Sequence, residues 1–423
     1  MTWLLLLLPL ALFILGVPIF AVLLTTAAVA LVTTLPMPPI ALHQLLFGGI
    51  DKYALLAVPF FVFAGELMSR GGIAERLVAW VLALTGRLPG SLGVATVGTA
   101  TLMGAVSGSS PATVAAVGRS LYPSLLQQGY GQRFSLGLIA SSGSIAVVVP
   151  PSIAMILYGA SAEQSIPKLF QAGLLPGLLI ALAMALTIMV WAKGRDLGPR
   201  QAVSLDVILA ATRHAWAALL MPVVILAGIY LGWFSPTEAG GVACLYALLI
   251  ACLLYRSLSW RDVLDAAGEA ALLTAQILII VAAAGVFSWL LTVKGVPQSL
   301  VQALIALELS PPLFLLLVNL LLLGIGCLLD PTSAILVLTP LLLPLVLHLG
   351  IDPIHFGIVM TVNLSIGMFT PPFGLNLFVA QSVLSPDLAA IYRGILPFLA
   401  VQLLCLAAIT YLPPLSLILL PSP

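Results

Sequence analysis

Apolar residues dominate nearly the whole chain, in stretches of roughly 15 to 22 residues separated by short polar or glycine- and proline-containing segments. A helix needs about 20 residues to cross the hydrocarbon layer of a membrane, so about ten or eleven of these stretches are predicted to span it. The Leu- and Ala-rich runs lack the alternation of apolar and polar positions that a transmembrane barrel shows. Helices also satisfy their own backbone hydrogen bonds in lipid. The pattern therefore predicts an all-α polytopic membrane protein.

Composition supports this prediction and narrows the function. With 62% hydrophobic and 7% charged residues, a water-soluble fold could not bury the apolar surface. The formal net charge is +1 and the basic residues are scattered, so no nucleic acid partner is expected. The first residues, Met1–Trp3 and the leucines that follow, lack the features of a cleaved signal and are predicted to be a retained span. Histidines and cysteines are dispersed, so no cofactor is predicted.

Positive charges predict the orientation. If the polar segment 193–214 is cytoplasmic, counting spans in both directions places about twelve basic residues inside and three outside, as the positive-inside rule requires. The three outside are Lys52, Lys168 and Lys294. We therefore expect a multi-pass protein of the bacterial inner (cytoplasmic) membrane, with residues 193–214 as a cytoplasmic linker.

The two halves of the chain match each other at an offset of about 221 residues. The matching pairs include Pro123 and Pro344, Gly129 and Gly350, Pro150-Pro151 and Pro371-Pro372, Gly173 and Gly394, and Pro176 and Pro397. The predicted orientation gives the two copies opposite directions, and inverted repeats are a recurring plan of secondary transporters. The predicted first repeat is 1–192, with scaffold spans in 1–89 and a hairpin and a broken helix in 90–192. The second is 215–423, with scaffold spans in 215–310 and a hairpin and a broken helix in 311–423.

Each repeat contains two polar, irregular segments between apolar flanks. Ser107–Thr113 and Gly324–Ser333 have a polar tip between two apolar arms, which predicts a re-entrant hairpin in each repeat. Ser141–Ser152 and Asn363–Pro372 end in a double proline, which predicts a spanning helix that is unwound at that point. The alternative is that small residues let helices pack closely and that the prolines are tolerated kinks.

An unwound helix frees carbonyl oxygens. Together with Ser and Thr hydroxyls they form an oxygen cage suited to Na⁺, while half-helix N-termini pointing into the same cavity favour an anion. Asp330 at a hairpin tip is costly to bury and so is a functional candidate, with capping of the following helix as the alternative. Glu66 is predicted to pair with Arg70 one turn on, and Glu238 to complement a helix dipole.

Other functional classes lack their required residues. An intramembrane enzyme would need a nucleophile with a base, or a metal pair, at membrane depth, and the sequence shows no such pattern. A purely structural membrane protein would have no need for inverted, doubly broken helices. We therefore predict a carrier and not an enzyme.

At these positions the sequence resembles the large membrane subunit of tripartite ATP-independent periplasmic (TRAP) transporters, within the wider ion-transporter superfamily. The resemblance covers essentially the whole chain. It is carried by five stretches in combination: Ala64–Ile73, Ser107–Thr113, Gly143–Ser152, Asp330–Ala334 and Gly367–Gly374.

The resemblance implies an elevator mechanism, in which a transport domain of hairpins and broken helices slides against a scaffold. It implies Na⁺ as the coupling ion and an organic acid as the substrate. It also implies two protein partners, a small permease subunit on a separate chain and a soluble periplasmic solute-binding protein. The absence of a nucleotide-binding P-loop motif agrees with transport driven by an ion gradient. A receptor-independent Na⁺/dicarboxylate carrier of the same superfamily is the alternative.

The resemblance also implies site residues. The first Na⁺ site would use Ser107, Ser109, Ser110 and Gly143, with carbonyls near Val147 and Val149. The second would use Gly326, Asp330, Thr332, Gly367 and Thr370. The substrate would lie among the neighbouring residues Ser110, Thr113, Ser144, Ser152, Ser333, Asn363 and Pro372.

Overall fold

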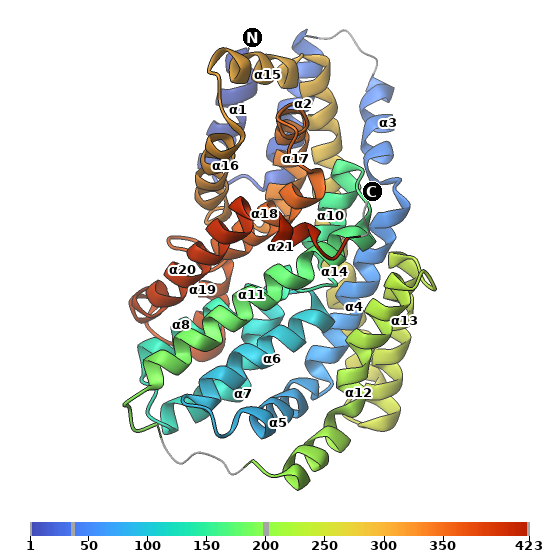
Figure 1. Cartoon of the computed structure of the whole chain (residues 1–423). Coiled ribbons are helices and arrows are strands. Elements are labelled where there is room, and N and C mark those ends of the chain that lie inside the picture. Colours follow the sequence, from blue (N-terminus) through green and yellow to red (C-terminus); the bar gives the residue numbers. More distant parts are fainter. Residues whose placement is uncertain (1, 35–38, 198–202, 421–423) are drawn as a thin grey trace.

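The computed structural model describes residues 2–34, 39–197 and 203–420, and every regular element in these ranges is a helix (Figure 1). The helices of the first half are α1 (Thr2–Ile14), α2 (Ile19–Thr34), α3 (Pro39–Ile50), the 3-10 helix η1 (Tyr53–Leu56), α4 (Ala57–Arg70), α5 (Ile73–Thr85), α6 (Ser91–Ser107), α7 (Ser110–Gln127), α8 (Gln132–Ser142), α9 (Ile145–Val148), α10 (Ile153–Ala162) and α11 (Ile166–Ala192). The all-helical prediction is confirmed for these ranges.

The second half begins after a polar connection. Its helices are α12 (Leu205–Tyr230), α13 (Pro236–Leu248), the π-helix η2 (Leu249–Leu254), α14 (Trp260–Val293), α15 (Val296–Ala306), α16 (Pro311–Gly326), α17 (Pro331–His348), α18 (Pro353–Gly367), α19 (Leu375–Leu384), α20 (Leu388–Tyr411) and α21 (Pro414–Leu417). Because α12 begins at Leu205, the predicted linker 193–214 is helical in its last part. Its residues 198–202 lie outside the described residues.

Seven helices of the described part are long and apolar enough to cross a membrane, or eight if the bent pair formed by 132–148 and 153–162 is one span. The sequence pattern predicted ten or eleven spans, and this number is too high by that criterion. The remaining apolar stretches form helices of 10 to 17 residues, which are too short to count. The pattern of apolar residues could not separate the long spanning helices from the shorter apolar helices, because glycines and prolines divide the apolar stretches. The helix of 153–162 is bent by 41° from the preceding one at Pro150-Pro151.

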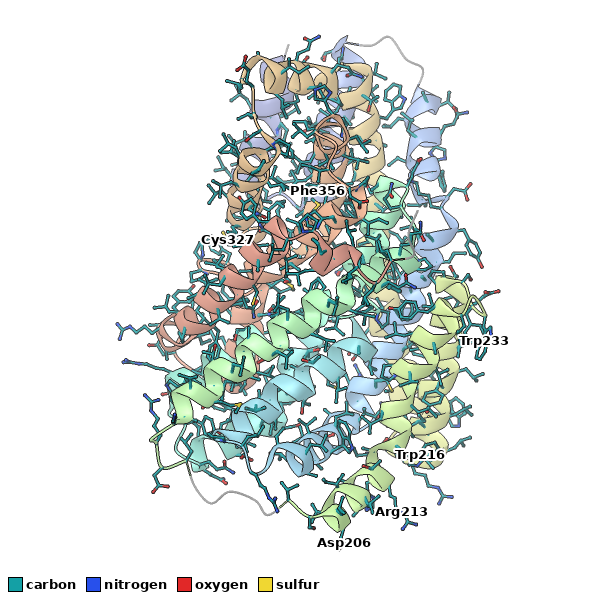
Figure 2. All side chains as sticks on the ribbon, viewed as in Figure 1. Asp206, Arg213, Trp216, Trp233, Cys327 and Phe356 are labelled. Atoms are coloured by element: carbon teal, nitrogen blue, oxygen red, sulfur yellow. The ribbon has the colours of Figure 1, made fainter. Side chains whose placement is uncertain are left out.

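Polar side chains fix where several helices begin. Ser204 accepts a hydrogen bond from the backbone at the start of α12. Ser235 and Glu238 form a capping box at the start of α13, and Ser259 and Asp262 form one at the start of α14. Glu238 therefore has the role at a helix start that the sequence predicted. Asp206 and Arg213 lie at one end of α12, and the exposed Trp233 lies beside its other end (Figure 2).

An ion-pair cluster joins α4 to α14. Arg70 Nε donates to Glu66 Oε1 at 2.8 Å, which confirms the predicted pair one helical turn apart. The Arg70 guanidinium also pairs with Glu269 of α14. Because these side chains are partly or largely exposed, the pairs position the two helices more than they stabilise the fold.

The sequence match between the halves reappears in the helices. α7 and α17 begin 221 positions apart, at Ser110 and Pro331, and α8 and α18 also begin 221 positions apart. Both double prolines, Pro150-Pro151 and Pro371-Pro372, contain a cis peptide bond. The helices that follow them, α10 and α19, begin 222 positions apart, at Ile153 and Leu375. The opposite orientation of the two copies stays a prediction.

The two halves are intertwined rather than placed side by side. α7 packs against α19 and its counterpart α17 packs against α10, while α8 packs against α20 and α18 against α11. Each of these helix pairs thus has a counterpart in which the corresponding helices come from the opposite halves. The long α14 packs against α2, α3, α4 and α17, so it lies beside both the first helices of the chain and the second copy (Figure 1).

Candidate functional site

A cavity of about 410 Å³ lies where the N-termini of α7 and α17 meet the middle of α14; we call it the central cavity. The helix breaks contribute Val147 and Met368 to its walls. Its lining residues are Gly108, Ser109, Ser110, Pro111, Val147, Ile153, Ala154, Leu273, Gln276, Ile277, Ile280, Asp330, Pro331, Thr332, Met368 and Leu375. Both polar tips predicted from the sequence thus lie on one cavity.

Ser109 and Asp330 cap the two helices whose N-termini line the cavity. Ser109 Oγ accepts from the backbone N–H of Ala112 at 3.5 Å at the start of α7. Asp330 Oδ2 accepts from the backbone N–H of Ser333 at 3.2 Å, and its Oδ1 accepts from Ser333 Oγ at 2.5 Å. Capping, the alternative role weighed for Asp330, is therefore present, and the residue lines the cavity as well.

The electrostatics of the cavity follow from this geometry. Each helix N-terminus carries a partial positive charge, because its first backbone N–H groups have no partner within the helix. Two such ends directed at one space favour an anion there. The Asp330 carboxylate at the same place offers a negative charge to a cation, so the cavity can accommodate charges of both signs.

The residues predicted for the first Na⁺ site lie at the tip of α6 and α7 and at the facing break. Ser107 Oγ accepts from the backbone N–H of Ser109 at 3.3 Å. A Cβ on Gly143 would lie 3.1 Å from both oxygens of Ser110, so these two residues are in direct contact. The carbonyl of Val147 accepts from Ser152 Oγ at 2.5 Å.

Val149 has a different environment from the rest of that set. It follows α9, and a Cβ on Gly177 of α11 would lie 2.6 Å from its Cγ2. Its side chain therefore packs against α11, and Val149 is not part of the central cavity's lining.

The residues predicted for the second Na⁺ site fall into two groups. Gly326 and Gly367 meet where the ends of α16 and α18 cross, and a Cβ on Gly326 would lie 3.3 Å from Cα of Gly367. Asp330 and Thr332 line the central cavity. Thr370 lies just after α18, and its Oγ1 donates to the carbonyl of Ile366 at 2.7 Å.

Of the predicted substrate residues, Ser110 lies in the central cavity's lining. Ser110 Oγ is also within 2.8 Å of Nδ2 of Asn376, which donates to it. Ser333 lies directly behind the lining, bonded to Asp330. Thr113 is fully buried and donates from Oγ1 to the carbonyl of Ser109 at 2.8 Å. These residues place hydroxyl groups on or next to the tips.

The other predicted substrate residues lie outside that lining. Ser144 Oγ donates to Gln402 Oε1 of α20 at 2.9 Å, so it is occupied in the packing of the core. Ser152 caps α10. Pro372 is exposed, and its carbonyl accepts from the Tyr392 hydroxyl at 2.8 Å.

Asn363, the last residue of that set, belongs to a buried polar network. Its Nδ2 donates to Asn319 Oδ1 at 2.8 Å, and Asn319 Nδ2 donates to Thr410 Oγ1 at 3.0 Å. Asn363 Oδ1 is buried and has no hydrogen-bond partner in the described part of the chain. Since Asn363 precedes Gly367 by four residues, both lie on the same side of α18.

The donor set fits a hard monovalent cation. Carboxamide, hydroxyl, carboxylate and carbonyl oxygens are available around Asn363, Asp330 and the two breaks, and a buried oxygen without a partner is costly unless a ligand satisfies it. Among the described residues no group of three or more His, Cys, Asp or Glu side chains could hold a metal ion. Oxygen ligands of these kinds suit hard cations rather than soft metal ions.

Two residues at this site were missed by the sequence analysis. Gln276 of α14 lines the cavity opposite the tips, beside the apolar Ile277 and Ile280, and its amide makes no hydrogen bond within the described residues. Asn376 of α19 holds Ser110 in place and also donates to the carbonyl of Ala140 at 3.0 Å. A lone carboxamide in a long apolar stretch was the available signal for Gln276.

Comparison with known proteins decides the family. The model of the family described as "Tripartite ATP-independent periplasmic transporter, DctM component" matches residues 6–415. The chain belongs to this TRAP transporter family. The family predicted from the five motif stretches is thus confirmed, and the chain is the large permease component of a tripartite system.

This TRAP large permease is similar to curated permeases over most of its length. It is 42% identical to the C4-dicarboxylate TRAP transporter large permease protein DctM of Pseudomonas aeruginosa, over 88% of this chain and 87% of that one. It is 40% identical to the isethionate TRAP transporter permease protein DctMQ of Oleidesulfovibrio alaskensis, over 95% of this chain. The aligned region spans 63% of the length of that relative. These relatives are permeases and not enzymes.

The fold of the TRAP permease also has a solved counterpart. The crystal structure of the YdaH transporter of Alcanivorax borkumensis superposes with a TM-score of 0.60 at 18% identity, covering 98% of this chain and 100% of that one. At that identity the likeness concerns the fold alone. It confirms the all-α fold of the chain.

Proposed function

We propose that the chain is the membrane permease of a Na⁺-coupled secondary transporter that imports an organic acid into the bacterial cell across the inner membrane. The observation that carries the proposal is the convergence of two helix N-termini, with Ser109 and Asp330 as their caps, on one cavity of about 410 Å³. Relatives named for C4-dicarboxylates, isethionate and ectoine support an organic acid as the substrate class.

The proposed binding uses the two signs of charge in the cavity. The acid group of the substrate would accept hydrogen bonds from the free N–H groups at the starts of α7 and α17, where the helix dipoles favour it. Na⁺ would be held by oxygens behind the tips, near Gly143 and Val147 in one half and near Asp330, Asn363 and Gly367 in the other. Neighbouring cation and anion sites lower each other's free energy of binding, which couples the two fluxes.

The proposed movement is of the elevator type. The hairpins and broken helices of the two halves pack on one another in exchanged pairs, which favours their moving as one body. α14, with α2, α3 and α4 packed against it, would form the stationary wall along which the tips slide. A separate small permease subunit and a periplasmic solute-binding protein complete the proposed system.

Reconstitution tests this proposal. The chain, the small subunit and the receptor are placed in liposomes, alone and together, and uptake of succinate, isethionate, ectoine and 2,3-diketo-L-gulonate is measured with an inward Na⁺ gradient. We expect uptake of at least one acid only with all three proteins and the Na⁺ gradient, and none with an equal K⁺ gradient. Uptake by this chain alone would indicate a receptor-independent carrier, and uptake without Na⁺ would exclude the proposed coupling.

A further inference from the structure

A second cavity of about 410 Å³ lies beyond the central one; we call it the outer cavity. The segment before η1 contributes Lys52 to it, α10 and the residue after it contribute Ser161 and Glu163, and α14 contributes Ser288 and Trp289. The outer cavity shares no residue with the central cavity, so it is a distinct space.

Three helices run along both cavities. On α14 the central cavity ends at Ile280 and the outer cavity begins at Val281. On α17 Thr332 lines the central cavity, and Leu336, one turn on, lines the outer one. α10 likewise passes from Ala154 in the first to Ala160 in the second. The two cavities therefore lie in line between the same three helices.

Lys52 supplies the positive charge of the outer cavity. Its Nζ donates to the carbonyl of Ala160 at 2.7 Å, near the C-terminal end of α10. An ammonium group has three N–H donors, so two remain for a ligand. The side chain is half-buried, so the ammonium group is partly enclosed by the cavity and still open to a ligand.

Glu163 limits what this charge can do. Its side chain is exposed and lines the same cavity as Lys52. The negative charge of Glu163 balances the positive charge of Lys52, so the described lining carries no net charge. The described structure contains no ion pair between Lys52 and Glu163. The ammonium therefore remains available to a ligand, but it fixes the position of a single acid group rather than concentrating anions from solution.

We propose that the outer cavity is a second binding site for the transported organic acid, on its path to the central cavity. Lys52 Nζ holds the acid group, and the hydroxyls of Ser161 and Ser288 bind polar atoms of the same molecule. The inference rests on the proposed function and adds a specific entry point to it. The orientation predicted from the positive charges places Lys52 outside, and in that orientation the site would receive the acid from the periplasmic side.

Uptake kinetics in the complete three-protein liposomes test the site, with whichever acid of the panel the unmodified system takes up best. We expect Lys52→Gln to lower kcat/KM by about tenfold, the effect of losing one charge-assisted hydrogen bond, and to leave the rate at saturating acid within about twofold. Lys52→Arg keeps the charge and should retain most of the uptake. Lys168→Gln, on the exposed start of α11 and outside both cavities, is the matched control and should change nothing.

Thiol labelling separates a binding role from a structural one, because Lys52 also contacts Ala160. Ser288→Cys places a thiol in the outer cavity, and we expect a membrane-impermeant maleimide added outside to label it more slowly when the acid is present. Combining it with Lys52→Gln should abolish that protection. A merely structural Lys52 would leave protection unchanged, and absence of labelling would show that the cavity does not open to the outside; either result overturns the inference.

The two proposals fail differently. If the unmodified system takes up none of the four acids, the proposed function fails, and the inference fails with it. If uptake is normal and Lys52→Gln has an unchanged kcat/KM, only the outer site is excluded.

Discussion

Gly326 at the end of α16 and Gly367 at the end of α18 are in backbone contact: a Cβ on Gly367 would lie 2.4 Å from the carbonyl carbon of Gly326. The first half contains the same crossing. There a Cβ on Gly104 of α6 would lie 2.4 Å from Cα of Ala146 in α9. Small residues let membrane helices approach this closely, and here they bring each hairpin against the broken helix of its own half.

The glycine contact predicts a steric effect. Gly367→Ala must displace the α16 backbone, because no flexible side chain lies there to move aside, and we expect a cost of about 1–3 kcal/mol. Thermal unfolding of the purified protein in detergent should show a lower Tm. Gly324→Ala, in the facing helix α16 and two residues before Gly326, is the control, since a Cβ there meets nothing within 4 Å. Equal Tm values for the two variants would contradict the close contact.

Asp330 allows capping to be separated from a role in the site. Asn caps helices about as well as Asp, so Asp330→Asn should keep the Tm of the unmodified protein, whereas Asp330→Ala should lose about 1 kcal/mol of stability. If the carboxylate helps to hold Na⁺ in the cavity, the uptake rate of both variants should be about tenfold or more below that of the unmodified protein. Asp387→Asn, at the exposed cap of α20, is the control for removing a capping charge. Normal uptake by Asp330→Asn would show that Asp330 only caps α17.

Much of the fold could be predicted because its signals are local. Apolar run length indicated helices, Pro150-Pro151 and Pro371-Pro372 indicated the breaks, and the spacing of Glu66 and Arg70 indicated their ion pair. The tips within Ser107–Thr113 and Gly324–Ser333 were identified because each is a polar segment between two apolar arms. Each of these features depends on residues within a few positions of one another.

The site was only partly predictable because it depends on contacts between distant segments. Ser110 and Asn376, 266 residues apart, are hydrogen-bonded across the halves, and no local pattern indicates that pairing. Ser144 was predicted to contact substrate, but its hydroxyl donates to Gln402 of α20, because α8 and α20 pack together. The wall formed by α14 escaped prediction because that helix is apolar around most of its circumference.

Gln276 gives the most direct test of that wall. α14 contributes Leu273, Gln276, Ile277 and Ile280 to the described lining of the central cavity, and of these four Gln276 has the polar side chain. Its amide offers two hydrogen-bond donors and one acceptor, and it makes no hydrogen bond within the described residues. Gln276→Leu keeps a similar size and suits the membrane, so insertion should be normal, while KM for the transported acid should rise by about five- to tenfold. Gln276→Asn shortens the side chain and should give a smaller rise. Gln276→Glu adds a negative charge to a cavity that already contains Asp330, and it should abolish uptake through repulsion of the acid.

Gln302→Leu, on the exposed face of α15 and outside the central cavity, controls for the loss of a glutamine. A KM for Gln276→Leu equal to that of Gln302→Leu would mean that the substrate binds at the helix tips without touching α14.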